Sequence, residues 1–217
     1  MSSTIIVSID GNIGSGKSTL ETELIKRFGV PVIHVKEPVE EWGNIKDKSG
    51  NTMLQLFYKD PLKYGFSFQI MAYISRLKLL KAAIKENPGA IIITERSLYT
   101  DKLVFAKMLY DTGKMEDVNY QIYLNWFDAF IEECGVNKII YIKASPETCY
   151  NRIALRARSG EEQIPIQYLT ECDIYHDEML KELSHIPQLV LDGNSDINTN
   201  PNKLDDWISQ IRDFILE

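Results

Sequence analysis

The sequence predicts a three-layer α/β fold, in which about five parallel strands form a sheet that helices cover on both faces. Short apolar runs rich in β-branched residues recur along the 217 residues, as is typical of buried parallel strands. The segments between these runs are long enough for crossover helices. The runs lie at residues 5–9, 31–35, 90–94, 138–142 and 188–191. No repeat or linker separates a second unit, so we expect one domain over residues 1–217.

Composition and charge limit the partners of the chain. With 44% apolar and 25% charged residues, it has the make-up of an ordinary globular protein. No apolar run approaches the roughly 18 residues that cross a bilayer, and the first strand begins too early for a leader, so we expect a cytoplasmic protein without a membrane partner. The formal net charge of −7 argues against a nucleic-acid polymer as partner. The three widely spaced cysteines argue against a zinc site.

The first predicted strand leads into a glycine-rich loop that a helical pattern follows. Residues 11–18 read GNIGSGKS and fit the phosphate-loop pattern. Glycines let backbone N–H groups close around phosphate oxygens, and the helix N-terminus adds further donors. Lys17 supplies a charge toward the β and γ phosphates, and the Ser18 hydroxyl can bind Mg²⁺. The predicted triphosphate-binding set is Gly11, Asn12, Ile13, Gly14, Ser15, Gly16, Lys17, Ser18 and Thr19.

Glu37 and Trp42 follow the second predicted strand. The C-terminal edges of parallel strands hold ligands, so Glu37 could face the same crevice as the phosphate loop. Taken alone, Glu37 is more simply an ordinary loop carboxylate, and Trp42 a packing residue.

Residues 51–87 form a helical pattern that breaks at residues 60–61. Gln69 and Arg76 are seven residues apart and therefore nearly aligned on one helix face. Such a polar pair could read the edge of a small planar ligand. A solvated helix face explains the same pattern.

Glu95 and Arg96 directly follow the third predicted strand. Beside a phosphate loop, Glu95 could reach Mg²⁺ directly or through water, and Arg96 could stand near the transferred phosphoryl group. The alternative is an exposed charge pair at a helix start. Farther along, a helix over residues 117–133 is richer in aromatic residues than one covering face needs, so it suggests a dimer contact or additional core packing.

Three arginines follow the fourth predicted strand within a short segment. Arg152 and Arg156 are one helical turn apart, and Arg158 lies near a glycine, so they could close over a triphosphate as a lid covering about residues 152–165. The alternative is a helix face on which these arginines pair with glutamates. A helix over residues 165–183, a loop at residues 191–196 and a closing helix over residues 207–215 complete the pattern.

Together these segments resemble the deoxyribonucleoside kinases of the deoxycytidine and deoxyguanosine kinase type. The likeness extends from residue 5 to about residue 196. It rests on GNIGSGKST at 11–19, EPVEEW at 37–42, FYKDPLKYGFSFQ at 57–69, ERS and YTD within 95–101, and RIALRARSGEEQIP at 152–165. The resemblance implies a P-loop kinase fold with an arginine-rich lid, a homodimer, and ATP- and Mg²⁺-dependent phosphorylation of a 2′-deoxynucleoside at its 5′-hydroxyl, in deoxynucleotide salvage.

The resemblance also implies roles for the residues around the phosphoryl group. Glu37 corresponds to the general base for the 5′-hydroxyl. Arg96 corresponds to the arginine near that hydroxyl, Lys17 to the phosphate-loop lysine, and Glu95 to the acidic partner of the metal beside Ser18. The donor nucleotide would be held by Arg152, Arg156, Arg158, Asp192, Asn194 and Asp196.

On the acceptor side, Tyr58 and Glu161 correspond to the pair that holds the sugar 3′-hydroxyl. Glu162 is the alternative if the lid register differs, because Gly160 stands where relatives often carry an acidic residue. The base pocket would be formed by Ile13, Trp42, Phe68, Gln69 and Phe105.

Ala72, Arg76 and Asp101 correspond to the specificity triad of deoxycytidine and deoxyguanosine kinases, whereas thymidine-accepting relatives carry apolar residues there. The Arg76–Asp101 pair offers donors and an acceptor to a base edge with an amino group, and a 5-methyl group should fit poorly beside it. We therefore expect deoxycytidine, deoxyadenosine or deoxyguanosine to be preferred over thymidine.

Two other functions fit part of the pattern. A nucleoside monophosphate kinase shares the phosphate loop and arginine lid, but it needs cations around the acceptor phosphate, where this chain offers Tyr58 and Glu161. A non-catalytic nucleotide-binding regulator needs neither Glu37 nor Arg96.

Overall fold

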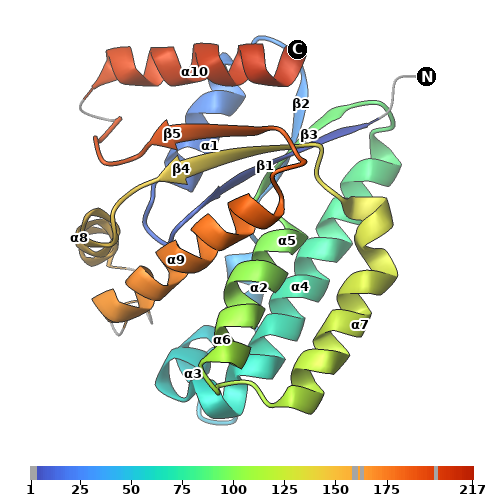
Figure 1. Cartoon of the computed structure of the whole chain (residues 1–217), viewed down its shortest axis with the longest axis vertical. Coiled ribbons are helices and arrows are strands. Elements are labelled where there is room, and N and C mark those ends of the chain that lie inside the picture. The colour runs from blue at the N-terminus through green and yellow to red at the C-terminus, as the bar shows by residue number, and fades with distance from the viewer. Residues whose placement is uncertain (1–3, 158–160, 162–163, 198–199) are drawn as a thin grey trace.

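The computed structural model describes residues 4–157, 161, 164–197 and 200–217, and these contain a five-stranded parallel sheet. Its strand order is β2-β3-β1-β4-β5 (Figure 1). The strands are β1 (Ile5–Gly11), β2 (Val32–Val35), β3 (Ile91–Glu95), β4 (Lys138–Lys143) and β5 (Gln188–Asp192). All five lie within two residues of the runs predicted from the sequence. The predicted α/β fold with a parallel sheet is therefore confirmed.

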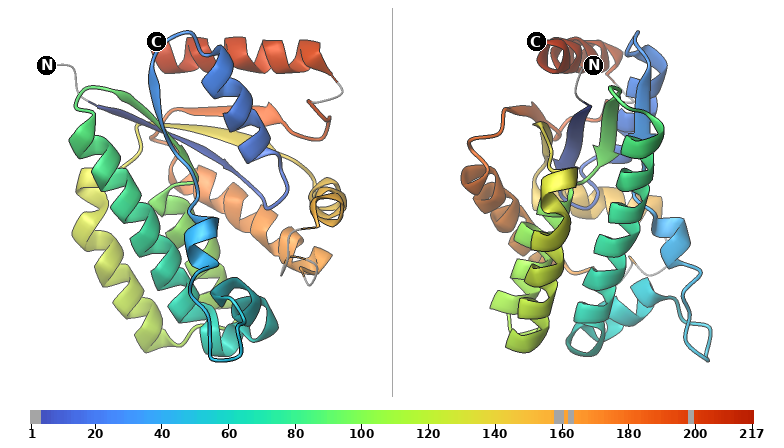
Figure 2. Two further views of the ribbon diagram at one scale, coloured as in Figure 1. Left: turned by 180° about the vertical axis from the view of Figure 1, so that it is seen from behind. Right: turned by 90° about the vertical axis from the view of Figure 1, so that its right-hand side faces the viewer.

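Helices form a layer on each face of the sheet, as Figures 1 and 2 show. One layer holds α1 (Lys17–Arg27) and α10 (Pro201–Leu216). The other layer holds α4 (Pro61–Glu86), α5 (Leu98–Thr100), a π-helical segment (Asp101–Ala106), α6 (Lys107–Asp111), α7 (Asp117–Cys134) and α9 (Ile166–Glu182). Helices α2 (Val39–Trp42) and α8 (Pro146–Arg156) follow β2 and β4, and α3 (Met53–Lys59) packs against α4 away from the sheet (Figure 1).

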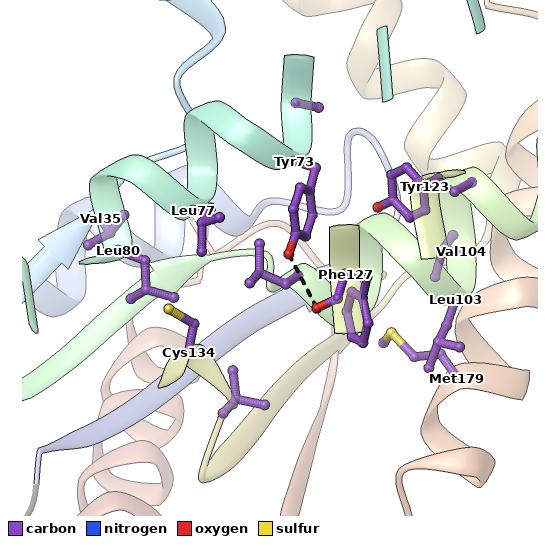
Figure 3. Packing of buried hydrophobic residues seen from close by; sticks show 14 of the residues in the cluster. Val35, Tyr73, Leu77, Leu80, Leu103, Val104, Tyr123, Phe127, Cys134 and Met179 are labelled. Atoms are coloured by element: carbon purple, nitrogen blue, oxygen red, sulfur yellow. Dashed lines mark hydrogen bonds between the residues drawn. The ribbon is translucent and has the colours of Figure 1, made fainter. Parts of the chain in front are cut away.

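Strand alternation gives each layer its own apolar core, because successive side chains point to opposite faces of a sheet. On β1, Val7 and Ile9 pack toward α1 and α10, whereas Ile6 packs toward α4 and α7. Figure 3 shows the larger core, in which the Tyr73 hydroxyl of α4 donates a hydrogen bond to the Phe127 carbonyl of α7, at 3.5 Å. The alternation also leaves Ser8 and Asp10 on the α9 side of the sheet.

Local signals explain where the helices begin and end. The predicted break at residues 60–61 is present, because the Asp60 side chain accepts a hydrogen bond from the Lys63 N–H and Pro61 starts α4. The closing helix begins at Pro201 rather than at the predicted residue 207, since Asn200 caps it. Among the described residues, no helix combines the length and apolar character that crossing a membrane would require.

Candidate active site

The phosphate loop connects the end of β1 to the start of α1 in a conformation that needs its glycines. Gly14 and Gly16 have φ values of +81° and +105°, and a Cβ atom at Gly14 would lie 2.6 Å from the Cys149 carbonyl oxygen. The Asn12 side-chain amide ties the loop to α9 by donating to the Leu169 carbonyl, at 2.8 Å. The loop therefore has a fixed shape before any ligand arrives.

Lys17 points back into this loop. Its Nζ donates to the carbonyl oxygens of Gly11, at 3.0 Å, and Asn12, at 2.8 Å. Burial and the nearby positive charge of Arg96 lower the pKa of Lys17 to about 7. The ammonium group is therefore poorly compensated and would gain from a nearby anion.

Ser18 and Glu95 meet where α1 begins and β3 ends. The Ser18 hydroxyl donates to Glu95 Oε1 at 2.7 Å. The contact follows from topology, because β3 pairs with β1 and both strands end at the same edge of the sheet. The described residues contain no group of three or more His, Cys, Asp or Glu side chains that could hold a metal ion. A cation at this point would therefore need phosphate oxygens and water as its remaining ligands.

Glu37 lies between two buried guanidinium groups. Its Oε1 is 3.0 Å from Arg76 Nη2 and 3.3 Å from Arg96 Nε. Burial alone would raise the pKa of Glu37, but the charges of Arg96, Arg76 and Lys17 outweigh it and hold the pKa below the usual range. Glu37 is therefore ionised at neutral pH.

Arg96 adopts a left-handed backbone conformation, with φ +64°, that is rare outside glycine. Its N–H donates to the Ile9 carbonyl at 3.0 Å, and its Nη1 donates to the Gly11 carbonyl at 2.9 Å. Its guanidinium carbon also lies 4.9 Å from the centre of the Phe105 ring. Such strain is often found where a side chain must point in one direction for function.

Arg76 and Asp101 form a buried ion pair in which Asp101 lines the cavity. Arg76 Nε donates to Asp101 Oδ2 at 2.9 Å, and Arg76 Nη1 donates to the Glu95 carbonyl. Burial raises the pKa of Asp101, and the charge of Arg76 opposes this only in part. The Gln69 side chain is also buried and lines the cavity, and none of the described residues forms a hydrogen bond with it. The Gln69 side-chain amide can therefore hydrogen-bond to a ligand, and the small Ala72 side chain leaves space beside the ion pair.

Aromatic side chains form one wall of the cavity. The Phe68 ring stacks on Phe57, with 4.5 Å between centroids, and meets the edge of Trp42 at 5.5 Å. The indole N–H of Trp42 donates to the Ser75 hydroxyl at 2.9 Å. Phe57 was not singled out in the sequence, although it lies in the motif that contains Tyr58.

The partly buried Tyr58 lies close to the buried Glu161. Burial and the charge of Glu161 raise the pKa of Tyr58 well above its usual range. Glu161 is 5% exposed, and its Oε2 forms an ion pair with Arg156 Nη2 at 2.5 Å. Arg158, Gly160 and Glu162 lie outside the described residues.

Arg152 joins three segments around the phosphate loop. Its Nη1 donates to the carbonyl oxygens of Ser15, at 3.2 Å, and Gly193, at 2.8 Å. In the β5–α10 loop, Asp192 accepts hydrogen bonds from Asn194 and Lys203. Asp192 and Asn194 thus shape the loop, whereas Asp196 lines the cavity.

All of these elements surround one cavity of about 1170 Å³. Its lining includes the loop residues 13–19, Glu37, Glu95 and Arg96, and the sequence-predicted residues Trp42, Tyr58, Phe68, Gln69, Ala72, Asp101, Phe105, Arg152, Arg156, Glu161 and Asp196. It also includes Leu54, Tyr168 and Trp207, whose local patterns indicate only core packing. Pockets for a single ligand span about 300–1,000 Å³, so this cavity is larger than the usual pocket for one ligand.

Comparison with known proteins agrees with this arrangement. The deoxynucleoside kinase family model matches residues 7–216. Deoxycytidine kinase 1 of Xenopus laevis is 33% identical over 96% of this chain and 89% of its own length. A probable deoxycytidine kinase of fowlpox virus is 36% identical over 97% of this chain and 88% of its own length. The mitochondrial deoxyguanosine kinase of Xenopus laevis is 29% identical over 96% of this chain and 89% of its own length. The chain belongs to the deoxynucleoside kinase family, as its motifs predicted.

Proposed function

We propose that the chain transfers the γ-phosphoryl group of ATP to the 5′-hydroxyl of a 2′-deoxynucleoside in deoxynucleotide salvage, and that it prefers deoxycytidine, deoxyadenosine or deoxyguanosine to thymidine. The observation that carries this proposal is the position of Glu37. The Glu37 carboxylate contacts Arg76 and Arg96. It lines the same cavity as the phosphate loop and Asp101, the partner of Arg76.

Glu37 is the proton acceptor of this reaction. Both arginines lie close to its Oε1, and none of the described residues donates a hydrogen bond to Oε2, so Oε2 is available to the substrate hydroxyl. The lowered pKa keeps the carboxylate ionised, so it accepts the proton as the new P–O bond forms. No covalent intermediate on the protein is required.

The donor half of the cavity binds and neutralises the triphosphate. Lys17 exchanges its loop carbonyl partners for the β and γ phosphates, and Arg96 and the lid arginines Arg152, Arg156 and Arg158 surround the transferred group. Ser18 and Glu95 would hold Mg²⁺, which supplies positive charge to the bound phosphates when present. The loop that contains Asp192, Asn194 and Asp196 lies on the donor-base side.

The acceptor half binds the sugar and base. Tyr58 and Glu161 receive the 3′-hydroxyl, and a carboxylate at this point repels the phosphate of a nucleotide acceptor. Gln69 and the Arg76–Asp101 pair read an amino-bearing base edge between Phe68 and Phe105, beside Ala72, with Ile13 and Trp42 lining the pocket. An ion pair offers no apolar contact to a 5-methyl group, which disfavours thymidine.

The test compares acceptors. With ATP and Mg²⁺, the chain should release ADP with deoxynucleosides and much less ADP with their 5′-monophosphates. A preference for the monophosphates would identify a nucleoside monophosphate kinase instead. No ADP with any acceptor would favour a nucleotide-binding regulator.

A homodimer is part of this proposal. Val118, Ile122 and Trp126 of α7 are 64%, 41% and 45% exposed, and Trp126 stacks on Phe130 at 6.0 Å. Ile74 adds exposed apolar area on the neighbouring α4. A second copy of the chain would cover this surface.

A cytoplasmic location is also proposed. Its support is that Cys134, Cys149 and Cys172 are all buried free thiols, as is usual in a reducing compartment.

A further inference from the structure

Buried polar atoms without partners gather behind the phosphate loop. In the described part of the chain, seven buried side-chain polar atoms have no hydrogen-bond partner, and four of these belong to Ser8, Asp10, Tyr141 and His176. Buried polar groups in folded proteins are nearly always satisfied by protein or by water. A concentration of such atoms at one place therefore indicates a ligand.

Three of these atoms come from elements that meet at one point. Asp10 and Tyr141 are directly opposite each other in the pairing of β1 with β4, so their side chains leave the same face of the sheet. His176 of α9 covers this face, and its ring centroid is 5.7 Å from that of Tyr141. All three side chains are at most 1% exposed.

The hydrogen-bonding roles of the three atoms follow from their other contacts. His176 Nδ1 donates to the Cys172 carbonyl at 2.6 Å, which leaves Nε2 as an acceptor. Burial and the charge of Arg96 lower the pKa of His176 far below its usual range, so the ring stays neutral. The Thr100 hydroxyl donates to Asp10 Oδ1, which leaves Oδ2 as an acceptor.

Tyr141 supplies the complementary group. Burial and the charges of Asp173 and Asp177 raise the pKa of Tyr141, so its hydroxyl remains protonated. The site therefore presents two acceptors and one donor.

We propose that a buried water molecule binds among Asp10 Oδ2, Tyr141 Oη and His176 Nε2. The water donates its two hydrogens to Oδ2 and Nε2 and accepts the hydrogen of the Tyr141 hydroxyl, so every group finds a partner of the right kind. The bound water links the strand that precedes the phosphate loop to α9. It also supports the pocket wall, because the His176 ring lies 6.3 Å from the Phe105 ring.

The chain offers a matched control for this proposal. The Tyr123 hydroxyl of α7 is also buried without a partner, but none of the other unpartnered atoms comes from α7 or from α4, which packs against it and places the Tyr73 ring 5.7 Å from the Tyr123 ring (Figure 3). Removing that hydroxyl should leave the thermal midpoint unchanged or raise it. Tyr141→Phe should instead lower the midpoint by about 2–4 °C, because the bound water loses its donor.

Two measurements decide the matter. Thermal unfolding of Tyr141→Phe and Tyr123→Phe should give the different shifts stated above, and a crystal structure of the unmodified chain should show a water within hydrogen-bond distance of all three atoms. Equal midpoint changes in the two variants, or no solvent density among the three atoms, would overturn the proposal. Neither measurement depends on the proposed enzymatic activity.

Discussion

At the scale of single residues, the proposed phosphoryl transfer depends on Glu37. Replacing Glu37 by Gln keeps the side-chain volume and one hydrogen-bond acceptor but removes the proton acceptor. We expect kcat to fall by about 10²- to 10⁴-fold, while the dissociation constant for deoxycytidine, measured by calorimetry, changes little. Glu116→Gln alters an exposed glutamate and serves as the control. Near-normal turnover in Glu37→Gln would remove Glu37 from the role of general base.

The lowered pKa of Lys17 predicts that ATP binding is coupled to proton uptake. Its pKa of about 7 in the free protein should rise when phosphates surround the ammonium group, because opposite charge favours the charged form. At pH 8, ATP binding should therefore take up close to one proton. Calorimetry in buffers of different ionisation enthalpy measures this uptake, and the Lys17→Arg variant, whose guanidinium is always charged, should lack it. The same proton uptake in both proteins would contradict this account of Lys17.

Arg76 and Asp101 govern the choice of base in this account. Removing one partner would leave a buried unpaired charge, so both are replaced together as Arg76→Met and Asp101→Ala. The double variant should raise the efficiency toward thymidine relative to deoxycytidine by at least about tenfold, since an apolar pocket accepts a methyl group. The ratio of kcat/KM values for the two nucleosides measures this change. An unchanged ratio would show that the pair does not set base preference.

Contacts among these residues could not be read from the sequence. Glu37, Arg76 and Arg96 are far apart along the chain, and each has a plausible structural role on its own. Their ion pairs arise only when β2, α4 and β3 come together. The family resemblance supplied the roles, and the geometry adds that both arginines contact the same carboxylate oxygen.

At the scale of elements, α7 makes a prediction about assembly. Trp126→Glu places a charge within its exposed apolar surface and should convert a dimer to a monomer in sedimentation experiments. Leu155→Glu on α8 alters a side chain that is 86% exposed at a distant place and should leave the mass unchanged. A monomeric unmodified chain, or a dimer that survives Trp126→Glu, would contradict an α7 interface.

Elements with a strong periodic pattern of apolar residues could be predicted from the sequence. The segment with an irregular helical hydrogen-bond pattern could not. All five strands follow from β-branched runs, because burial on both faces leaves an apolar signal. The π-helical segment Asp101–Ala106 departs from the 3.6-residue period, so its boundaries carry no such signal. It nevertheless places Asp101 opposite Arg76, in the ion pair proposed to read the base.

At the scale of the whole molecule, one edge of the sheet carries the residues proposed to bind both substrates. The phosphate loop after β1, Glu37 after β2 and the Glu95–Arg96 pair at the end of β3 all lie at the C-terminal ends of adjacent strands. The cavity of about 1170 Å³ at this edge connects the phosphate-binding residues with the aromatic wall. The arrangement supports direct transfer between two substrates bound at the same time.

The most direct test of this account is a panel of the four deoxynucleosides at equal low concentration with ATP and Mg²⁺, in which formation of each 5′-monophosphate is followed by chromatography. We predict that the fastest reaction is with deoxycytidine, deoxyadenosine or deoxyguanosine, and that thymidine lags behind it. Thymidine phosphorylated as efficiently as, or more efficiently than, all three others would contradict the predicted preference, and no 5′-monophosphate from any nucleoside would contradict the proposed reaction itself.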